Sequence, residues 1–315
     1  MFSQSSRTFA LLVTLAVSVL LAFEIACAPN APVRVEQTDT SSPRPRQEFA
    51  DALGRRLEII HPPRRIISLA PNLTEIIFAM GAGDRLAGVT SYCDYPPAAR
   101  DKEKVGDTIQ PNIERIIALK PDLVLVSTSS QLEHLTTRLD QLSIPVYVTN
   151  PRTVQDVIAS IRRIGEVLGS QEAAGALAGE MQTRIESIQK QVESSRRVRV
   201  LYALQTGPLI VPGRNTFIND LLKLAGADSI SSSETADYPQ FSLESVIARA
   251  PEAIIVQDTH GAGGPSDAEL KRLFAVTPAI RNNRIIRVNP DLITRPGPRI
   301  VEGLEMLANA LHPNK

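Results

Sequence analysis

Two glutamates occupy the same position in two copies of one sequence unit. Glu114 lies in PNIERIIALKPDLVLV (residues 111–126), and Glu244 lies in FSLESVIARAPEAIIV (residues 241–256), at a constant offset of 130 residues. Each lies in the first turn of an expected helix, outside the apolar face of that helix. The helix dipole favours an anion at this position. Two equivalent carboxylates suit ion pairing with a partner that has two-fold symmetry. The alternative is that each only stabilises its own helix, by about 0.3–1 kcal/mol.

Each copy of the unit predicts a short helix followed by a buried strand. Asn112 and Ser242 are N-cap types, whose side-chain oxygens accept hydrogen bonds from free N–H groups of the first turn. Pro121 and Pro251 are expected to end the helices, because proline lacks a donor and clashes with the preceding turn. The apolar runs after them predict strands covered on both faces. A chain that contains this unit twice is expected to fold as two similar lobes.

The rest of the chain alternates expected strands and helices, which implies two Rossmann-like α/β lobes with central parallel sheets. The N-terminal lobe is expected over residues 49–169 and the C-terminal lobe over residues 196–315. Between them, Gln171 to Glu193 lacks proline and has apolar residues at spacings of four and three. At 1.5 Å per residue this helix would run about 35 Å. We therefore expect residues 170–195 to form one long bridging α-helix; the alternative is a surface helix of one domain.

Two local features near the start of the first lobe can be predicted as well. FADALGRRLEII, Phe49 to Ile60, predicts a hairpin with its turn at Asp51 to Gly54. Asn72 to Met80 predicts a helix, with Asn72 or Thr74 as its N-cap.

The N-terminus carries a predicted export signal. Residues 1–26 contain an apolar run, Phe9 to Phe23, that is shorter than the roughly 20 residues of a membrane span. Cys27 follows in a context that resembles a bacterial lipobox, although Glu24 stands where Leu is usual. We expect a signal peptide of the lipoprotein type and lipidation of Cys27; ordinary cleavage and an uncleaved anchor are the alternatives. Residues 27–48 are rich in Pro, Ser, Thr and charge, and predict a flexible tether.

Composition excludes several classes of function. The formal net charge is zero, so no bulk field attracts nucleic acid, and no nucleic-acid partner is expected. Cys27 and Cys93 are the only cysteines, and two cysteines do not make a disulfide framework. Cys93 has no adjacent His or Lys to favour a reactive thiolate, so a structural role is expected.

The motifs of common enzymes are missing. There is no dinucleotide fingerprint, Walker A sequence, HExxH or GxSxG. His61, His134, His260 and His312 are scattered without the spacing of metal ligands. We expect no catalytic residue, no metal site and no cofactor. His260 follows the second repeated unit in a Gly-rich segment, where it could contact a ligand or simply be solvated.

Taken together, these segments resemble the class III substrate-binding proteins of ABC importers, the helical-backbone type that captures cobalamin, iron–siderophores or haem. The resemblance covers about residues 47–313 and is carried by DALGRRLEI, RIISLAPNLTE, GVTSYCDYPP, IERIIALKPDLVLV, TFINDLLKLAGA, YPQFSLESVIARAPEAIIV and RPGPRIVEGL. It implies an exported monomer, in the periplasm or lipid-anchored on the outer face of the cytoplasmic membrane, that works with an ABC importer permease dimer. It also implies that Glu114 and Glu244 dock on permease arginines.

The resemblance implies a ligand site between the lobes, in loops at the carboxyl ends of the strands. The expected ligand-binding residues are Pro71, Asn72, Tyr92, Asp107 and Thr108 from the first lobe, with Ser127 and Thr128 as further candidates, and Asn215, Thr216, Tyr238, Gln240, His260 and Arg295 from the second. The SYCDYPP segment is most similar to the corresponding segment of cobalamin receptors. Those receptors place aromatic rings against the corrin at the positions of Tyr92 and Tyr238. Some of those receptors carry Trp at Thr108, and this chain has no Trp, but Tyr can also offer a flat apolar face. For both tyrosines the alternative is ordinary packing.

We therefore expect a non-enzymatic receptor that delivers a corrinoid to an ABC importer. A ferric-siderophore or haem receptor of the same family is the first alternative. Anionic siderophores usually need several cleft arginines, and the candidates here are Arg152, Arg214 and Arg295. An extracytoplasmic metal-inserting enzyme on the same bilobal plan is a distant alternative, since it would need convergent His or carboxylate groups. A sensory domain is not favoured, because no downstream transmembrane or signalling segment is seen.

Overall fold

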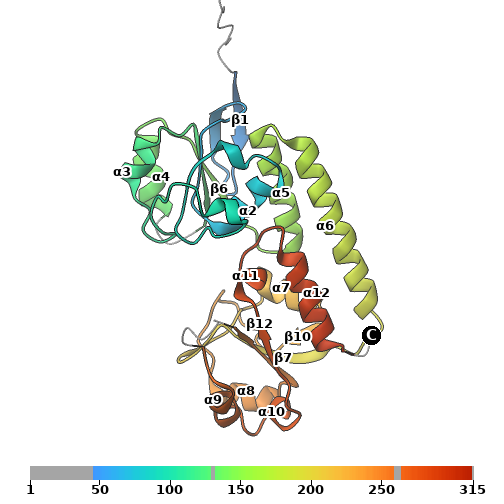
Figure 1. The fold of residues 1–315 in the computed structure, drawn as a ribbon. Helices are drawn as coiled ribbons and strands as arrows, with labels where there is room; N and C mark the ends of the chain where they lie inside the picture. The colour runs from blue at the N-terminus through green and yellow to red at the C-terminus, as the bar shows by residue number, and fades with distance from the viewer. Residues whose placement is uncertain (1–44, 129–131, 259–263, 314–315) are drawn as a thin grey trace, which may run out of the picture. The chain divides into compact units, whose positions relative to one another are not determined.

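The computed structural model describes residues 45–128, 132–258 and 264–313 (Figure 1). The expected signal peptide, most of the expected tether and Cys27 lie outside these residues. The described chain begins with a hairpin of β1 (Arg46–Ala50) and β2 (Arg56–Ile60), paired antiparallel. The hairpin is confirmed, but it starts earlier than predicted: Arg46 to Glu48, assigned to the tether, pair with Glu58 to Ile60.

The first sheet has four parallel strands in the order β4-β3-β5-β6. Its strands are β3 (Ile66–Ser68), β4 (Leu86–Val89), β5 (Leu123–Ser127) and β6 (Val146–Thr149). The helices around it are α2 (Pro71–Ala79), α3 (Ile113–Ala118), α4 (Leu132–Asp140) and α5 (Val154–Leu168), with short 3-10 turns at Gly83–Arg85 and Pro97–Ala99. We call the part from β1 to α5 the N-lobe.

The second sheet also has four parallel strands, in the order β10-β7-β11-β12. Its strands are β7 (Val198–Ala203), β10 (Ala227–Ser229), β11 (Ala253–Gln257) and β12 (Ile285–Val288); β8 (Gln205–Thr206) and β9 (Leu209–Ile210) form a small separate hairpin. The helices are α7 (Phe217–Leu224), α8 (Leu243–Arg249), α9 (Asp267–Leu273), α10 (Pro278–Arg281), α11 (Pro290–Ile293) and α12 (Ile300–Leu311). This part is the C-lobe. The two sheets share one strand order, which confirms the predicted α/β fold with two lobes.

A single long helix connects the two lobes. Helix α6 (Gln171–Val192) has 22 residues and runs beside both lobes in Figure 1. In the N-lobe it packs against α5, where Gly165 leaves room for the Ala174 side chain. In the C-lobe it packs against α12, and Arg184 Nη2 lies 2.9 Å from Glu305 Oε2. The predicted bridging helix is therefore present.

The hydrophobic core is continuous between the lobes. One cluster of buried side chains includes Leu73 and Ile161 of the N-lobe, Met181 and Ile185 of α6, and Leu304 of α12. Each lobe has in addition its own smaller cluster, which we call its outer cluster. Because close-packed interiors resist deformation, we expect the core shared through α6 to limit relative movement of the lobes.

The repeated unit is built largely as its sequence predicts. Asn112 accepts a hydrogen bond from the Arg115 N–H at 3.0 Å, and Ser242 accepts one from the Ser245 N–H at 3.1 Å, so both N-caps are confirmed. The helices end earlier than predicted, at Ala118 and Arg249. Lys120 and Ala250, the residues before the two prolines, both have φ of 46°. Proline disfavours the α conformation of the residue before it, so its effect begins before the proline itself.

The predicted N-cap of α2 is wrong. The cap position is Ala70 without a side-chain hydrogen bond, and Pro71 begins the helix, as its fixed φ allows. Asn72 and Thr74 lie inside the helix. The Thr74 hydroxyl donates to Ser68 Oγ at 2.8 Å, and Asn72 Nδ2 donates to the Pro296 carbonyl oxygen of the C-lobe at 3.3 Å.

Candidate functional site

Two adjoining cavities lie between the lobes. The first has a volume of about 220 Å³ and is lined by Pro71, Asn72, Thr108, Ser127 and Thr128 of the N-lobe and by Thr294, Arg295 and Pro296 of the C-lobe, among others. The second has a volume of about 310 Å³ and is lined by Ser127, Thr128, Asn150, Pro151 and Arg152 of the N-lobe and by Thr216, Phe217, Asp237, Tyr238, Thr294 and Pro296 of the C-lobe. Four of these residues line both cavities, so we treat the two as one cleft.

The parallel sheet explains why these N-lobe residues meet. The segments after β3, β5 and β6 contribute Pro71, Ser127 and Asn150 to the cleft, and all three strands end at the same edge. Open α/β sheets place ligands at this edge, because the connecting loops converge there. The predicted position of the site, between the lobes at the carboxyl ends of strands, therefore coincides with this cleft.

The repeated unit extends further toward the N-terminus than its helix. DTIQ, residues 107–110, aligns with DYPQ, residues 237–240, at the same offset of 130. Thr108 lines the first cavity, and its counterpart Tyr238 lines the second. The two lobes thus present equivalent backbone positions to the two halves of the cleft, with different side chains.

The two aligned aspartates have different partners. Asp107 Oδ1 accepts hydrogen bonds from the backbone N–H groups of Ile109 and Gln110, at 2.7 and 2.6 Å, and so shapes its own turn. Asp237 instead forms an ion pair with Arg152 of the N-lobe. Only the second aspartate therefore joins the lobes.

A network of ion pairs bounds the other side of the cleft. Arg295 of the C-lobe lies 2.8 Å from Asp94 Oδ1, 2.8 Å from Asp291 Oδ1 and 3.5 Å from Glu75 Oε1. Arg299 donates to both oxygens of Glu75, at 2.6 and 2.9 Å, and its guanidinium lies 4.0 Å from the centroid of the Tyr95 ring.

The charges in this network are stabilised mutually. The Glu75 side chain is only 2% exposed, and Arg295 and Arg299 are 16% and 13% exposed. Burial would raise the pKa of Asp94, but the hydrogen bond and positive charge of Arg295 outweigh it and lower that pKa. The hydrogen bond from Arg299 to Glu75 raises the pKa of Arg299. We call Glu75, Asp94, Asp291, Arg295 and Arg299 the interlobe network.

Further polar contacts join the lobes beside the second cavity. Asp220 Oδ2 of α7 accepts a hydrogen bond from the Val154 N–H at the start of α5, at 2.8 Å. Burial, together with the negative charge of Asp237, raises the pKa of Tyr238, while Arg152 lowers it. The Tyr238 hydroxyl therefore keeps its proton and can act as a donor in the cleft.

The predicted site residues divide into three groups. Pro71, Asn72, Thr108, Ser127, Thr128, Thr216, Tyr238 and Arg295 line the cleft cavities. Tyr92, Asp107 and Gln240 are not among the residues that line them. Asn215 lines a third cavity of about 560 Å³, which adjoins the cleft because Arg152, Thr216 and Asp237 line both. His260 lies outside the described residues.

Some residues that line the cleft were not predicted from the sequence. They include Asn150, Pro151, Phe217, Asp237, Thr294 and Pro296. Asp237 could have been found by extending the repeated unit to DTIQ and DYPQ. Asn150 and Pro151 directly follow the β6 strand, and a search of every strand end would have included them.

Gly213 supports the segment that carries Asp237 and Tyr238. Its N–H donates to the Asp237 carbonyl oxygen at 2.8 Å, and a Cβ at this position would overlap the Ala236 carbonyl oxygen. Because the obstacle is backbone, Gly213→Ala is expected to shift this segment and to lower the free energy of unfolding by about 1–3 kcal/mol. Gly175→Ala is the control: nothing lies within 4 Å, and alanine in a helix should stabilise by up to about 1 kcal/mol. Urea unfolding measures both, and equal stability of Gly213→Ala and the native chain would contradict the prediction.

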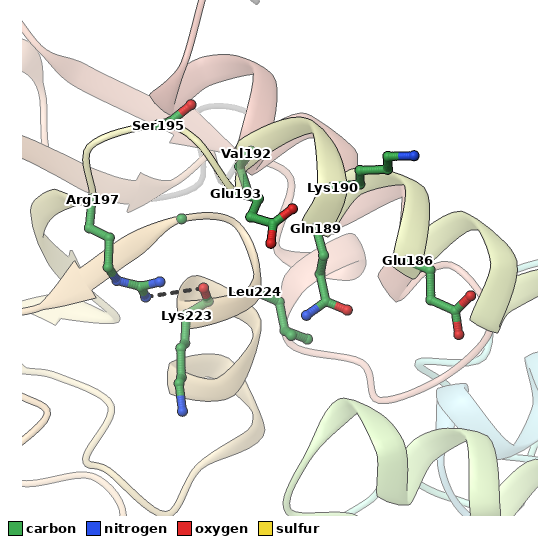
Figure 2. A pocket seen from close by; sticks show the side chains of 10 residues that line it. Glu186, Gln189, Lys190, Val192, Glu193, Ser195, Arg197, Lys223 and Leu224 are labelled. Carbon is green, nitrogen blue, oxygen red and sulfur yellow. Dashed lines mark hydrogen bonds between the residues drawn. The ribbon is translucent and has the colours of Figure 1, made fainter.

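Another cavity, of about 610 Å³, lies at the C-terminal end of α6 (Figure 2). Glu186 and Gln189 of α6, with the C-cap residue Glu193, face Arg197 and the end of α7 across it. Arg197 is already bound by Asp228 at 2.5 Å and by the Lys223 carbonyl oxygen at 3.1 Å. None of the predicted ligand-binding residues lines this cavity, so it is not the predicted site.

The described residues contain neither a candidate metal site nor a candidate membrane span. No group of three or more His, Cys, Asp or Glu side chains in residues 45–128, 132–258 and 264–313 is arranged to hold a metal ion. In the same part of the chain, no helix combines the length and apolar character that crossing a membrane requires.

The two predicted docking glutamates are both exposed, in the first turns of α3 and α8. Neither Glu114 nor Glu244 has an ion pair with another described residue. Hydrogen bonds in the first turn, the largest from its own backbone N–H, lower the pKa of Glu244. A charged, unpaired carboxylate is thus available at the Glu244 position.

Two α/β lobes, one bridging helix and a cleft at the ends of parallel strands are an architecture suited to binding a small molecule between two lobes. The sequence pattern described as periplasmic binding protein matches residues 66–292. The chain therefore belongs to this family, whose members are the class III substrate-binding proteins of ABC importers.

Individual relatives agree with this assignment. The chain is 33% identical over 272 residues to the ABC transporter substrate-binding lipoprotein YvrC of Bacillus subtilis, covering 84% of this chain and 85% of that protein. It is 30% identical over 254 residues to the vitamin B12-binding protein of Vibrio cholerae, covering 79% and 90%.

Solved structures show the same fold. The periplasmic vitamin B12 binding protein BtuF of Vibrio cholerae superposes with a TM-score of 0.72 at 29% identity, covering 80% of this chain and 98% of that chain. The periplasmic haem-binding protein BhuT, in complex with two hemes, has a TM-score of 0.72 at 26% identity, covering 78% and 98%. Proteins of this family bind substrates outside the cytoplasm and work with a permease; they are not enzymes.

Proposed function

We propose that this protein is a lipid-anchored receptor that binds a corrinoid such as cobalamin in the cleft and delivers it to the permease dimer of an ABC importer. Cys27 would carry the anchor, and the protein would act as a monomer. The vitamin B12-binding protein of Vibrio cholerae supports the ligand, and the lipoprotein YvrC supports the anchor. Glu114 and Glu244 would contact arginines of the permease.

The observation that carries the choice of ligand is the neutralisation of Arg152 and Arg295, the two arginines that line the cleft cavities. Arg295 is surrounded by three carboxylates, and Arg152 is paired with Asp237. Neither guanidinium is available to an anionic chelate without breaking ion pairs that join the lobes. The polar groups that remain include Thr108, Ser127 and Asn150. Neutral hydroxyl and amide groups suit the amide side chains that surround a corrin ring.

The size of the cleft adds a condition to this proposal. The two cavities, of about 220 and 310 Å³, together fall within the roughly 300–1,000 Å³ of pockets that enclose drug-sized ligands. A corrinoid is larger than most drugs, so the cleft must widen. The Arg152–Asp237 pair, whose side chains are 49% and 40% exposed, is the interlobe ion pair that solvent can replace most easily.

Titration of residues 28–315 with cyanocobalamin, followed by calorimetry, tests the proposal. We expect saturable one-to-one binding at submicromolar affinity. Tyr238→Ala should weaken binding about tenfold, because an aromatic ring that stacks on a ligand contributes about 0.5–1.5 kcal/mol beyond the area it buries. Tyr238→Phe keeps the ring and serves as the matched control, with affinity close to that of the native chain. If the protein is folded and the titration releases no heat, the corrinoid is rejected as the ligand.

A haem receptor is the second candidate, and one observation favours it. Tyr92 and Tyr238 are both exposed, at 54% and 50%, and a tyrosine oxygen can ligate haem iron. Titration with haemin would then shift and sharpen the Soret band of haemin, and this change would be lost in Tyr92→Phe or Tyr238→Phe. A corrinoid site predicts no such loss. Among the described residues, the cleft shows no group of His or carboxylate side chains arranged to hold a metal ion that would favour the distant alternative of a metal-inserting enzyme.

A further inference from the structure

Exposed aliphatic side chains lie beside one of the two predicted docking glutamates. On α8, Leu243 and Ile247 flank Glu244 in the sequence and are 37% and 47% exposed. They are four residues apart, so they lie on the same side of the helix. The side chains that pack against the outer cluster of the C-lobe are Leu273, Ile280 and Ile285, and neither Leu243 nor Ile247 belongs to that set.

The aligned residues of the N-lobe have a different environment. Ile113 and Ile117 occupy the same places in α3, but both are half-buried and pack against the outer cluster of the N-lobe. The same helix–strand unit can therefore bury these two positions. Their exposure on α8 is a property of the C-lobe alone, and it is not required by the unit.

The N-lobe presents a smaller apolar surface near Glu114. Ile109, 57% exposed, lies in the turn directly before α3. The Asp107 carboxylate shapes this turn by accepting from the backbone N–H of Ile109. Asp107 was predicted to bind ligand, and in the structure its carboxylate holds the segment that displays Ile109.

These features define the chemistry of a partner. An exposed carboxylate beside two exposed aliphatic side chains suits a surface that offers a basic group next to apolar side chains. Isolated exposed aliphatic residues need no explanation. Here, however, the pair lies next to an unpaired carboxylate, on the helix that the repeat makes equivalent to α3.

We infer that Leu243 and Ile247 form an apolar anchor that binds the permease dimer at the C-lobe end, and that the receptor docks through two unequal contacts. This inference rests on the proposed function. The C-lobe contact combines Glu244 with the anchor, and the N-lobe contact combines Glu114 with Ile109. A two-fold symmetric permease offers the same surface twice, so the C-lobe contact would be the tighter of the two.

Site-specific photo-crosslinking in cells of the native bacterium tests this inference without knowledge of the ligand or of the permease. A benzophenone amino acid incorporated in place of Gln110, which is exposed and precedes α3, reports docking at the N-lobe end. The crosslinked protein is identified by mass spectrometry. The reporter is then compared in the native background, in the Leu243→Ser, Ile247→Ser background, and in the Val276→Ser background. Val276 is 59% exposed, lies on the same lobe outside α8, and provides the matched control.

We expect the reporter to capture an integral-membrane permease subunit in the native background. Loss of two half-exposed aliphatic contacts should reduce the crosslinking yield about tenfold in the double serine variant. Val276→Ser should leave it unchanged. Capture of the permease with equal yields in all three backgrounds would overturn the anchor and leave the proposed docking intact. Capture of no permease subunit would overturn both.

Discussion

The Glu114→Ala, Glu244→Ala double variant is expected to bind cyanocobalamin as the native chain does and to support no measurable uptake. Both carboxylates are exposed, and neither forms an ion pair with another described residue, so the fold and the cleft do not depend on them. A hydrogen bond to an ionised group contributes about 1.5–3 kcal/mol. Loss of two such contacts with the permease should weaken docking about a hundredfold or more. Uptake of radiolabelled cyanocobalamin by cells and calorimetry on the purified variant measure the two properties separately.

A matched control separates docking from the loss of charge. Glu172 and Glu302 are also exposed and lie in the first turns of α6 and α12. The Glu172→Ala, Glu302→Ala variant changes the net charge equally and should transport at the native rate. Normal uptake by the Glu114, Glu244 variant would exclude the docking role. Loss of its cyanocobalamin binding would show instead that these residues act on the ligand.

Glu75→Ala is expected to cause a large loss of stability. The Glu75 carboxylate is almost fully buried and lies within 3.5 Å of both Arg295 and Arg299. Its removal leaves two largely buried guanidinium groups without their shared partner, and breaking a buried ion pair in this way costs about 3–5 kcal/mol. For a domain of this size, that corresponds to a fall in Tm of about 10 °C. Differential scanning calorimetry of the apo-protein measures it.

Two further variants test whether the interlobe network causes the loss of stability in Glu75→Ala. Glu58 forms an ion pair with Arg46 whose side chains are both 67% exposed, so Glu58→Ala should cost less than about 1 kcal/mol. The Glu75→Leu, Arg299→Met variant removes the carboxylate and its main partner together. Because apolar residues of similar volume can replace a buried pair at little cost, it should recover much of the lost stability. Equal loss of stability in Glu75→Ala and Glu58→Ala would contradict the role of the interlobe network.

The local elements of this protein follow from its local sequence. The N-caps Asn112 and Ser242 form as predicted, because a cap depends on groups three residues apart in the chain. The repeated unit, the alternation of strands and helices, and the apolar stripe of α6 depend on the same short-range periodicities. They are sufficient for the two lobes and the bridging helix, and the family resemblance adds the position of the cleft at the strand ends.

The availability of side chains for a ligand depends instead on how the lobes pack. Arg295 was predicted to bind ligand, yet its partners Glu75 and Asp94 lie 220 and 201 positions away in the chain. Asp107 and Asp237 hold the same place in the repeat, but Asp107 closes its own turn and Asp237 meets Arg152 of the other lobe. No short-range pattern contains such a pairing, because a charged side chain takes the partner that folding brings near it. The sequence therefore determined the lobes and the equivalent positions in them, and only the tertiary structure decided which polar groups remain free in the cleft.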